Sequence, residues 1–173
     1  MKKWLAITTL IGSLTACGGS DSNPTAPTAT PVNIAASYAA KVTASSTCST
    51  NLPAETREHD FLANITQTGA AVQVQLIAHV PGVPEITFAG TVSGQTVNIP
   101  SFSFTQTMGR GAALAASGNA SVAANGLSIA GTLSGTFQTS SGASCNATNH
   151  QLQLIKLCSF PTANGTAMLP CQQ

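Results

Sequence analysis

The stretch Val72-Gln73-Val74-Gln75-Leu76 decides the fold, because its apolar and polar residues alternate without a break. Successive side chains of a β-strand point to opposite faces, so the apolar residues share one face and the glutamines the other. We therefore predict a strand with one packed face and one face in water. Just ahead of it, Phe61, Ala63 and Ile65 keep the same period, and Thr68-Gly69 between the two runs predicts a tight hairpin turn.

Alternating runs of this kind continue to the end of the chain, and we count seven or eight strands. At Pro100-Ser101 the phase slips by one residue, so we expect a β-bulge or bend there, at an edge or corner of the sheet. Residues 33–45 fit either an alanine-rich helix or a first strand, and we favour the strand. The strongest turn signal is Asn125-Gly126. The further alternating runs are Ile86 to Val92, Val97 to Ile99, Leu127 to Phe137 and Gln151 to Leu157.

A short internal sequence repeat supports the prediction that similar hairpins recur along the chain. Residues 88–94 (FAGTVSG) recur 41 residues later as residues 129–135 (IAGTLSG). Glycine inside a strand marks strong curvature or a close approach of two backbones, and closing a sheet removes edges that would aggregate. We therefore predict an all-β fold, a single small antiparallel meander that forms a barrel or a strongly coiled sheet.

The first residues are ordered as a secretory signal. Lys2 and Lys3 precede an apolar run from Trp4 to Ile11, and small residues then lead to Cys17. The apolar run is too short to span a bilayer, which takes about 20 residues. We therefore expect this leader to be removed from the mature protein.

Leu14-Thr15-Ala16-Cys17 resembles the lipobox of bacterial lipoproteins, and the resemblance is confined to the leader. It implies that the thiol of Cys17 receives diacylglycerol before a peptidase cuts just ahead of it. Two acyl chains give stable anchoring where one gives only marginal binding. Gly18 stands where aspartate marks inner-membrane retention in the family, so the resemblance favours the outer membrane of a Gram-negative host. A plasma-membrane anchor in a Gram-positive host, and an ordinary signal peptide with a chance cysteine, are the alternatives.

The chain divides into three parts on this basis. Residues 1–16 are the signal peptide, residues 17–32 are the lipidated cysteine with a Ser/Thr/Pro-rich spacer, and residues 33–173 are the β-rich domain. The spacer cannot bury enough apolar surface to fold, so we expect it to hold the domain away from the bilayer.

Four of the five cysteines remain once Cys17 is assigned to lipid. An even number in an exported domain favours disulfide bonds, and sequence alone allows three pairings. We favour Cys48 with Cys145, which joins the two ends of the domain, and Cys158 with Cys171, which holds the tail on the last strand. A zinc site is the alternative, but structural zinc cysteines come as close pairs and no such pair occurs, so we expect no metal.

Charge excludes nucleic acid as a partner. Charged residues make up 6% of the chain, against roughly 25% in an average soluble protein. Without the leader, the four basic residues Lys41, Arg57, Arg110 and Lys156 stand against five acidic ones. Binding to nucleic acid requires clustered basic residues that neutralise phosphates, and the sequence has no such cluster.

The sequence does not point to an enzyme. The only dense group of ionisable residues is Arg57-Glu58-His59-Asp60, with His79 and His150 elsewhere. On a strand, Glu58 and Asp60 share a face that His59 does not, which separates a base from its orienting acid. Motifs of serine hydrolases, metalloproteases and nucleotide-binding proteins are absent. We therefore expect no catalytic residue, no metal and no cofactor.

Several functions fit these features. The preferred hypothesis is a non-catalytic envelope module that is anchored to the membrane through Cys17 and binds another envelope protein or decorates the surface. The alternatives are a carrier or sensor of a small apolar ligand, by analogy with barrel carriers alone, and an inhibitor of host hydrolases.

Overall fold

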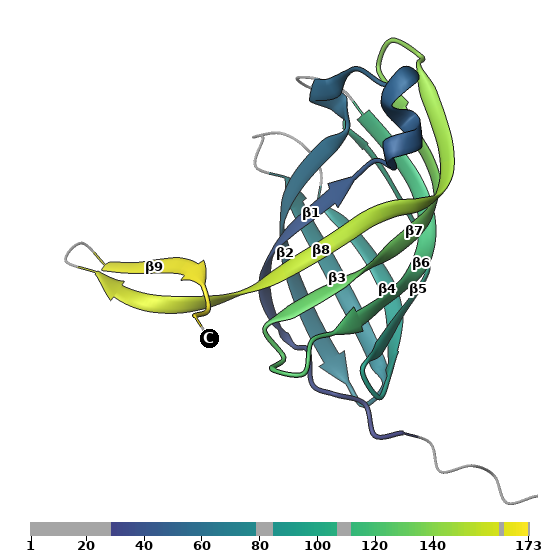
Figure 1. Ribbon diagram of the computed structural model, residues 1–173. Helices are drawn as coiled ribbons and strands as arrows, with labels where there is room; N and C mark the ends of the chain where they lie inside the picture. Colours follow the sequence, from purple (N-terminus) through teal and green to yellow (C-terminus); the bar gives the residue numbers. More distant parts are fainter. Residues whose placement is uncertain (1–28, 79–84, 107–111, 163–164, 173) are drawn as a thin grey trace, which may run out of the picture.

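The predicted all-β fold is confirmed in the computed structural model, which describes residues 29–78, 85–106, 112–162 and 165–172. Cys17 and the rest of the leader lie outside the described residues, as does His79. Within the described residues, sheet order follows chain order through an antiparallel meander (Figure 1). Strand β1 pairs with both β2 and β8, and this second pairing closes an eight-stranded barrel. The elements are β1 (Ala36–Thr43), η1 (Ser46–Thr50), η2 (Ala54–Thr56), β2 (Glu58–Thr68), β3 (Ala71–Ala78), β4 (Ile86–Ser93), β5 (Thr96–Gln106), β6 (Ala112–Val122), β7 (Ser128–Thr139), β8 (Ser144–Thr162) and β9 (Gly165–Pro170).

Alternation along each strand builds the core as predicted. Val72, Val74 and Leu76 of β3 are buried, whereas Gln73 between them is exposed. Tyr38 of β1 is fully buried, and its hydroxyl donates a hydrogen bond to the carbonyl of Ile34 at 2.9 Å. The single polar atom of this ring is therefore satisfied, and its apolar body packs inside the barrel.

The predicted turns and the predicted bulge are present. Gly69 and Gly126 have φ angles of 60° and 70° at the ends of hairpins, a backbone conformation that glycine adopts without steric cost. The register of β5 against β6 shifts between Ile99 and Phe102, which places the bulge at Pro100-Ser101. A bulge increases the local twist, so it helps the sheet to curve towards closure.

Close approach explains a glycine in the internal repeat. A Cβ atom on Gly131 of β7 would overlap the backbone oxygen of Asn119 and the Cα atom of Ala120, both on β6. Any side chain there would force β6 and β7 apart. The expectation that glycines mark tight backbone contact in a coiled sheet is confirmed at this position.

Two short helices and a disulfide bond cover one end of the barrel. The η1 residue Cys48 is fully buried and is bonded to Cys145 at the start of β8. Leu52, between the two helices, is also buried, so this segment adds apolar surface to the core. No helix in the described part of the chain is long and apolar enough to cross a membrane.

Both favoured cysteine pairings are confirmed. The Cys48–Cys145 bond spans 97 residues and the Cys158–Cys171 bond spans 13. The second bond lies outside the barrel, because β8 runs on beyond the barrel wall and pairs there with β9 alone (Figure 1). The sequence predicted that this bond would pin the tail, but it did not predict a projecting hairpin.

Candidate functional site

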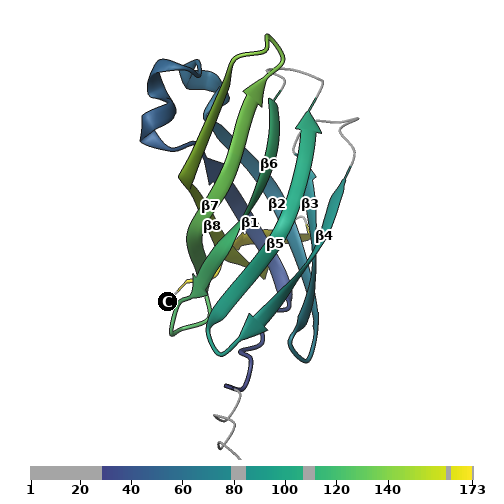
Figure 2. The ribbon, with the colours of Figure 1, turned by 90° about the vertical axis from the view of Figure 1, so that its right-hand side faces the viewer.

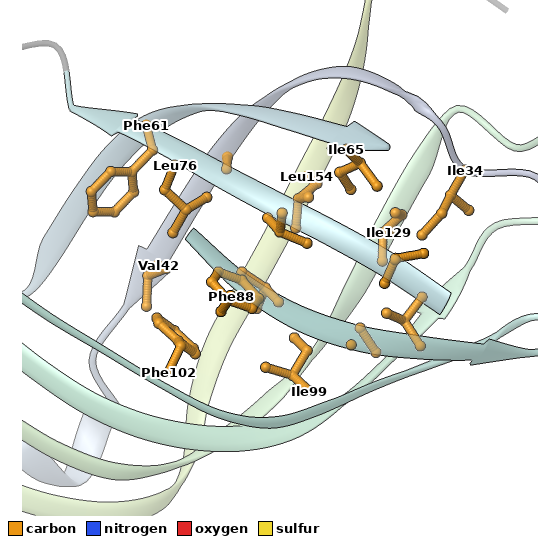
Figure 3. A pocket seen from close by; sticks show the side chains of 17 residues that line it. Ile34, Val42, Phe61, Ile65, Leu76, Phe88, Ile99, Phe102, Ile129 and Leu154 are labelled. Atoms are coloured by element: carbon orange, nitrogen blue, oxygen red, sulfur yellow. The ribbon is translucent and has the colours of Figure 1, made fainter. Parts of the chain in front are cut away.

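The inside of the barrel is the first candidate site. Inward-facing side chains meet there and leave an apolar void of about 30 Å³ (Figure 3). A small-molecule pocket is usually about 300 to 1,000 Å³, so side chains fill the barrel in this conformation. The lining residues carry no polar side chain, and such a void suits only an apolar occupant. They are Ile34, Ala40, Val42, Phe61, Ile65, Val72, Val74, Leu76, Phe88, Gly90, Val97, Ile99, Phe102, Ala120, Ile129, Leu152 and Leu154.

The barrel wall is incompletely paired between β4 and β5, which Figure 2 turns towards the viewer. Only Thr91 to Ser93 on β4 pair with Thr96 to Asn98 on β5. Beyond that point residues 99 and 102–106 of β5 pair with β6 alone, and the bulge falls at the start of this stretch. We call the unpaired part of this wall, residues 86–90 of β4 and 99–103 of β5, the seam.

Two phenylalanines close the seam. Phe88 of β4 and Phe102 of β5 stack with ring centroids 4.7 Å apart and an angle of 21° between the rings. Phe102 is buried and Phe88 is half-buried. Both rings line the inner void and also an open groove of about 680 Å³ on the outside of the barrel. The two rings therefore separate the apolar interior from a surface groove, at a place where the strands themselves do not pair.

The groove itself is neutral and rich in hydroxyl groups. Thr87, Ser101, Ser103, Ser117 and Ser134 line it together with alanines and the two phenylalanines. None of its lining residues is ionisable. The groove can therefore offer hydrogen bonds and apolar contact, but no charge.

The charged cluster divides as its strand geometry predicts. Glu58 and Asp60 lie on the outer face of β2, where they form ion pairs with the ammonium of Lys41 on β1 at 3.1 and 3.8 Å. The hydrogen bond that the Lys41 ammonium donates to the carboxylate of Glu58, followed by the charge of Asp60, raises the pKa of Lys41 above its usual value. All three side chains are strongly exposed, and pairs of this kind contribute little to stability.

His59 points away from those carboxylates. Its ring stacks on Phe137 of β7 with centroids 5.9 Å apart, and Nε2 lies 3.1 Å from the carbonyl of Thr56. Burial lowers the pKa of His59, against smaller opposing effects of the Thr56 hydrogen bond and the charge of Asp60. The ring is thus half-buried against Phe137, and Glu58 and Asp60 lie on the other side of the strand.

His150 is a structural residue that the sequence reasoning did not assign. It is fully buried, its Nδ1 accepts from the backbone N–H of Ser45 at 3.0 Å, and its Nε2 donates to the carbonyl of Gly135 at 2.9 Å. These two bonds connect the segment after β1 with β7, beside the register shift between β7 and β8. The sequence did contain evidence that His150 is buried, because it follows the same alternation as Leu152 and Leu154, whose side chains face inward on the same strand.

Comparison with protein-family models, with curated proteins and with solved structures finds no match to this chain. The site must therefore be interpreted from its own chemistry.

Metal-binding chemistry is not assembled in the part of the chain that the structure describes. No group of three or more His, Cys, Asp or Glu side chains is arranged there to hold an ion. The four described cysteines form disulfide bonds and so offer no thiolate.

Proposed function

We propose that this chain is a membrane-anchored bacterial lipoprotein that acts as a non-catalytic binding or structural module of the cell envelope. The observation that carries the proposal is Leu14-Thr15-Ala16-Cys17 at the end of a leader with a basic start and a short apolar run. In a Gram-negative host the glycine after Cys17 favours the outer membrane.

The anchor and the spacer set the reach of the domain. Two acyl chains on Cys17 would hold the protein at the bilayer, since stable anchoring takes two such signals. Residues 18–32 contain three prolines, and an extended proline-rich segment spans about 3.1 Å per residue. Fifteen residues of this kind place the barrel within roughly 45 Å of the lipid headgroups.

Mass spectrometry of the protein purified from its native membranes tests the proposal. The mature chain is expected to begin at Cys17 and to carry the mass of the lipid, and it should partition into detergent. The matched Cys17→Ser variant should lose both the lipid mass and the detergent partitioning. An intact starting methionine, or an unmodified Cys17, would refute the proposal.

A second candidate is a carrier of a linear apolar ligand, favoured by the apolar interior behind the Phe88–Phe102 pair. The void of about 30 Å³ holds no such ligand, so binding requires both rings to swing out of the seam. The ligand would then replace the two rings inside the barrel, while its polar end would meet the hydroxyl groups of the groove.

Uptake of a fluorescent fatty acid tests the carrier candidate. Phe88→Ala should speed uptake several-fold, because it both enlarges the void and opens the seam. Phe61→Ala is the matched control, since Phe61 lines the same void from β2 and lies outside the seam. No uptake by the natural chain and by both folded variants would refute this candidate, and equal acceleration by both variants would show that the seam is not the route.

A further inference from the structure

The last part of the chain forms a hairpin that lies outside the barrel. Strand β8 pairs with β1 as far as Lys156 and with β7 as far as Ile155, and from Leu157 onward its partner is β9. Figure 1 shows this hairpin projecting sideways from the wall. We call the described residues 157–162 and 165–171 the arm.

The arm is held in shape by its own covalent bond. The Cys158–Cys171 disulfide lies at its base, next to the point where the backbone N–H of Cys171 donates to the carbonyl of Lys156 at 2.9 Å. A two-stranded hairpin is at best marginally stable in water, and a disulfide limits how far its strands can separate. The chain therefore maintains a projecting hairpin, in which β9 pairs with no strand other than β8 in the described residues.

Exposed apolar surface is concentrated on this element. Among the described residues, the large hydrophobic side chains that are exposed are Ile155, Met168 and Leu169. Met168 and Leu169 are on the arm, at 50% and 52% exposure, and Ile155 lies at its root. The outer faces of other strands instead carry polar side chains such as Gln73 and Gln153. The apolar surface of the arm is thus a local feature and not a general property of the barrel.

The register between β8 and β9 and the lack of charged residues indicate what kind of partner the exposed face of the arm could bind. Leu169 stands opposite Cys158, and Ala167 stands opposite Phe160, so the half-buried ring of Phe160 shares one face with Leu169 and the disulfide. Met168 stands opposite Ser159 and lies on the other face. Residues 157–173 include no Lys, Arg, His, Asp or Glu. A partner for this face must therefore be apolar and need no countercharge.

The arm leaves the barrel at the end where the N-terminal chain joins it. The backbone N–H of Lys156, at the root of the arm, donates to the carbonyl of Leu127 beside the β6–β7 turn. The backbone N–H of Val32 donates to Gly94 in the β4–β5 turn. In an up-and-down meander these two turns lie at the same end of the barrel. The route to Cys17 and the arm thus start from one end of the molecule.

From these observations we propose that the arm is a second, non-covalent membrane contact, in which Leu169 and Phe160, on one face of the arm, enter the interfacial region of the bilayer. The inference rests on the proposed lipid anchor. Cys17 is twelve residues from Ala29, where the described chain begins, a span of at most about 43 Å. Tethering at that range keeps the arm at high effective concentration beside lipid, so weak apolar insertion becomes persistent. A neutral apolar arm needs no anionic lipid.

Tryptophan fluorescence provides a direct test, because Trp4 is the only tryptophan and leaves with the leader. The acylated Leu169→Trp variant, purified from its host, is reconstituted in phosphatidylcholine vesicles with brominated acyl chains. We expect its emission to be blue-shifted and quenched several-fold more than that of the matched Gln153→Trp variant, whose residue is exposed on the barrel wall of the same strand. Phe160→Ser, which removes the other large apolar side chain from the same face, should reduce the quenching in the Leu169→Trp background.

Flotation of the same vesicles separates the two proposals. If the acylated protein floats and the Leu169→Trp indole is quenched, the arm contacts lipid. If the protein floats and this indole is quenched no more than that of Gln153→Trp, the anchor stands and the arm inference is overturned. A blue shift without quenching also overturns it, because the arm is then covered by a second copy of the chain. Protein that does not float overturns the anchor and, with it, the inference.

Discussion

Removing each disulfide in turn should affect the stability of the barrel to very different extents, although both bonds are native. The Cys48–Cys145 ring of 97 residues encloses β2 to β7, whereas the Cys158–Cys171 ring of 13 residues encloses only the arm. Chain-entropy arithmetic assigns a ring of about 100 residues roughly 4.7 kcal/mol and one of about 15 residues roughly 3 kcal/mol. The larger contribution stabilises the barrel against unfolding, whereas the smaller one stabilises only a hairpin outside the barrel.

We therefore expect Cys48→Ala with Cys145→Ala to lower the free energy of unfolding by about 6 kcal/mol, including about 1 kcal/mol for the space left by two buried sulfur atoms. A domain of this size has a total stability of about 5 to 15 kcal/mol, so this variant lies near the limit of folding. Cys158→Ala with Cys171→Ala should change the same quantity by less than about 0.5 kcal/mol, the scale of surface substitutions.

Urea unfolding followed by Tyr38 fluorescence measures both effects. Tyr38 is the only tyrosine and is fully buried on β1, so its emission reports the barrel and not the arm. Far-ultraviolet circular dichroism on the same samples checks that the transitions coincide. A loss of about 3 kcal/mol in the arm variant would refute the reasoning, because the arm and barrel would then unfold as one unit.

Three further changes test the interior. His150→Ala should cost about 3 kcal/mol in urea unfolding, because it leaves the buried N–H of Ser45 and the half-buried carbonyl of Gly135 without their partner. A cost below about 1 kcal/mol would contradict the role of these two hydrogen bonds. Gly131→Ala should cost about 3 kcal/mol by forcing β6 and β7 apart, and an unchanged midpoint would contradict the close approach. Burial holds the pKa of His59 below its usual 6.5, so the unfolded chain binds the proton more readily, and stability should fall as pH drops from about 7.5 to about 5.5. The His59→Gln variant should lose less stability over this pH range than the natural chain. An equal loss in the two proteins would contradict the assignment of this pH dependence to His59.

Local patterns predicted the parts of this fold that local physics controls. Alternation identified β2, β3 and β7, the turn residues located the hairpins, and the slip at Pro100 located the bulge. Glycines inside strands pointed to strong coiling, and Gly131 shows why. Each of these signals depends on a residue and its immediate neighbours.

Features that depend on register between strands were not visible in the sequence. The same alternation runs through Ile86 to Val92 and through Val97 to Ile99. The pattern therefore does not show that β4 and β5 stop pairing after three residue pairs. The arm was missed because Pro161 and Pro170 argue against central strands, and a hairpin outside the barrel tolerates proline at its free edges. The charged cluster, in contrast, was correctly separated, since the side-chain period of a strand places Glu58 and His59 on opposite faces.

The surface chemistry of the chain is easiest to understand at an interface. A net charge near zero promotes association of freely diffusing proteins, and this chain carries few charges of either sign. Closure of the barrel through β1 and β8 removes two edges that would otherwise pair with other chains, and hydroxyl and amide side chains cover much of the wall. The exposed arm is the exception, because it has free edges and apolar side chains together. Such an element is a liability for a protein in dilute solution, and the proposed contact with lipid would remove that liability, because a bilayer would bury Leu169 without offering a strand edge to pair with.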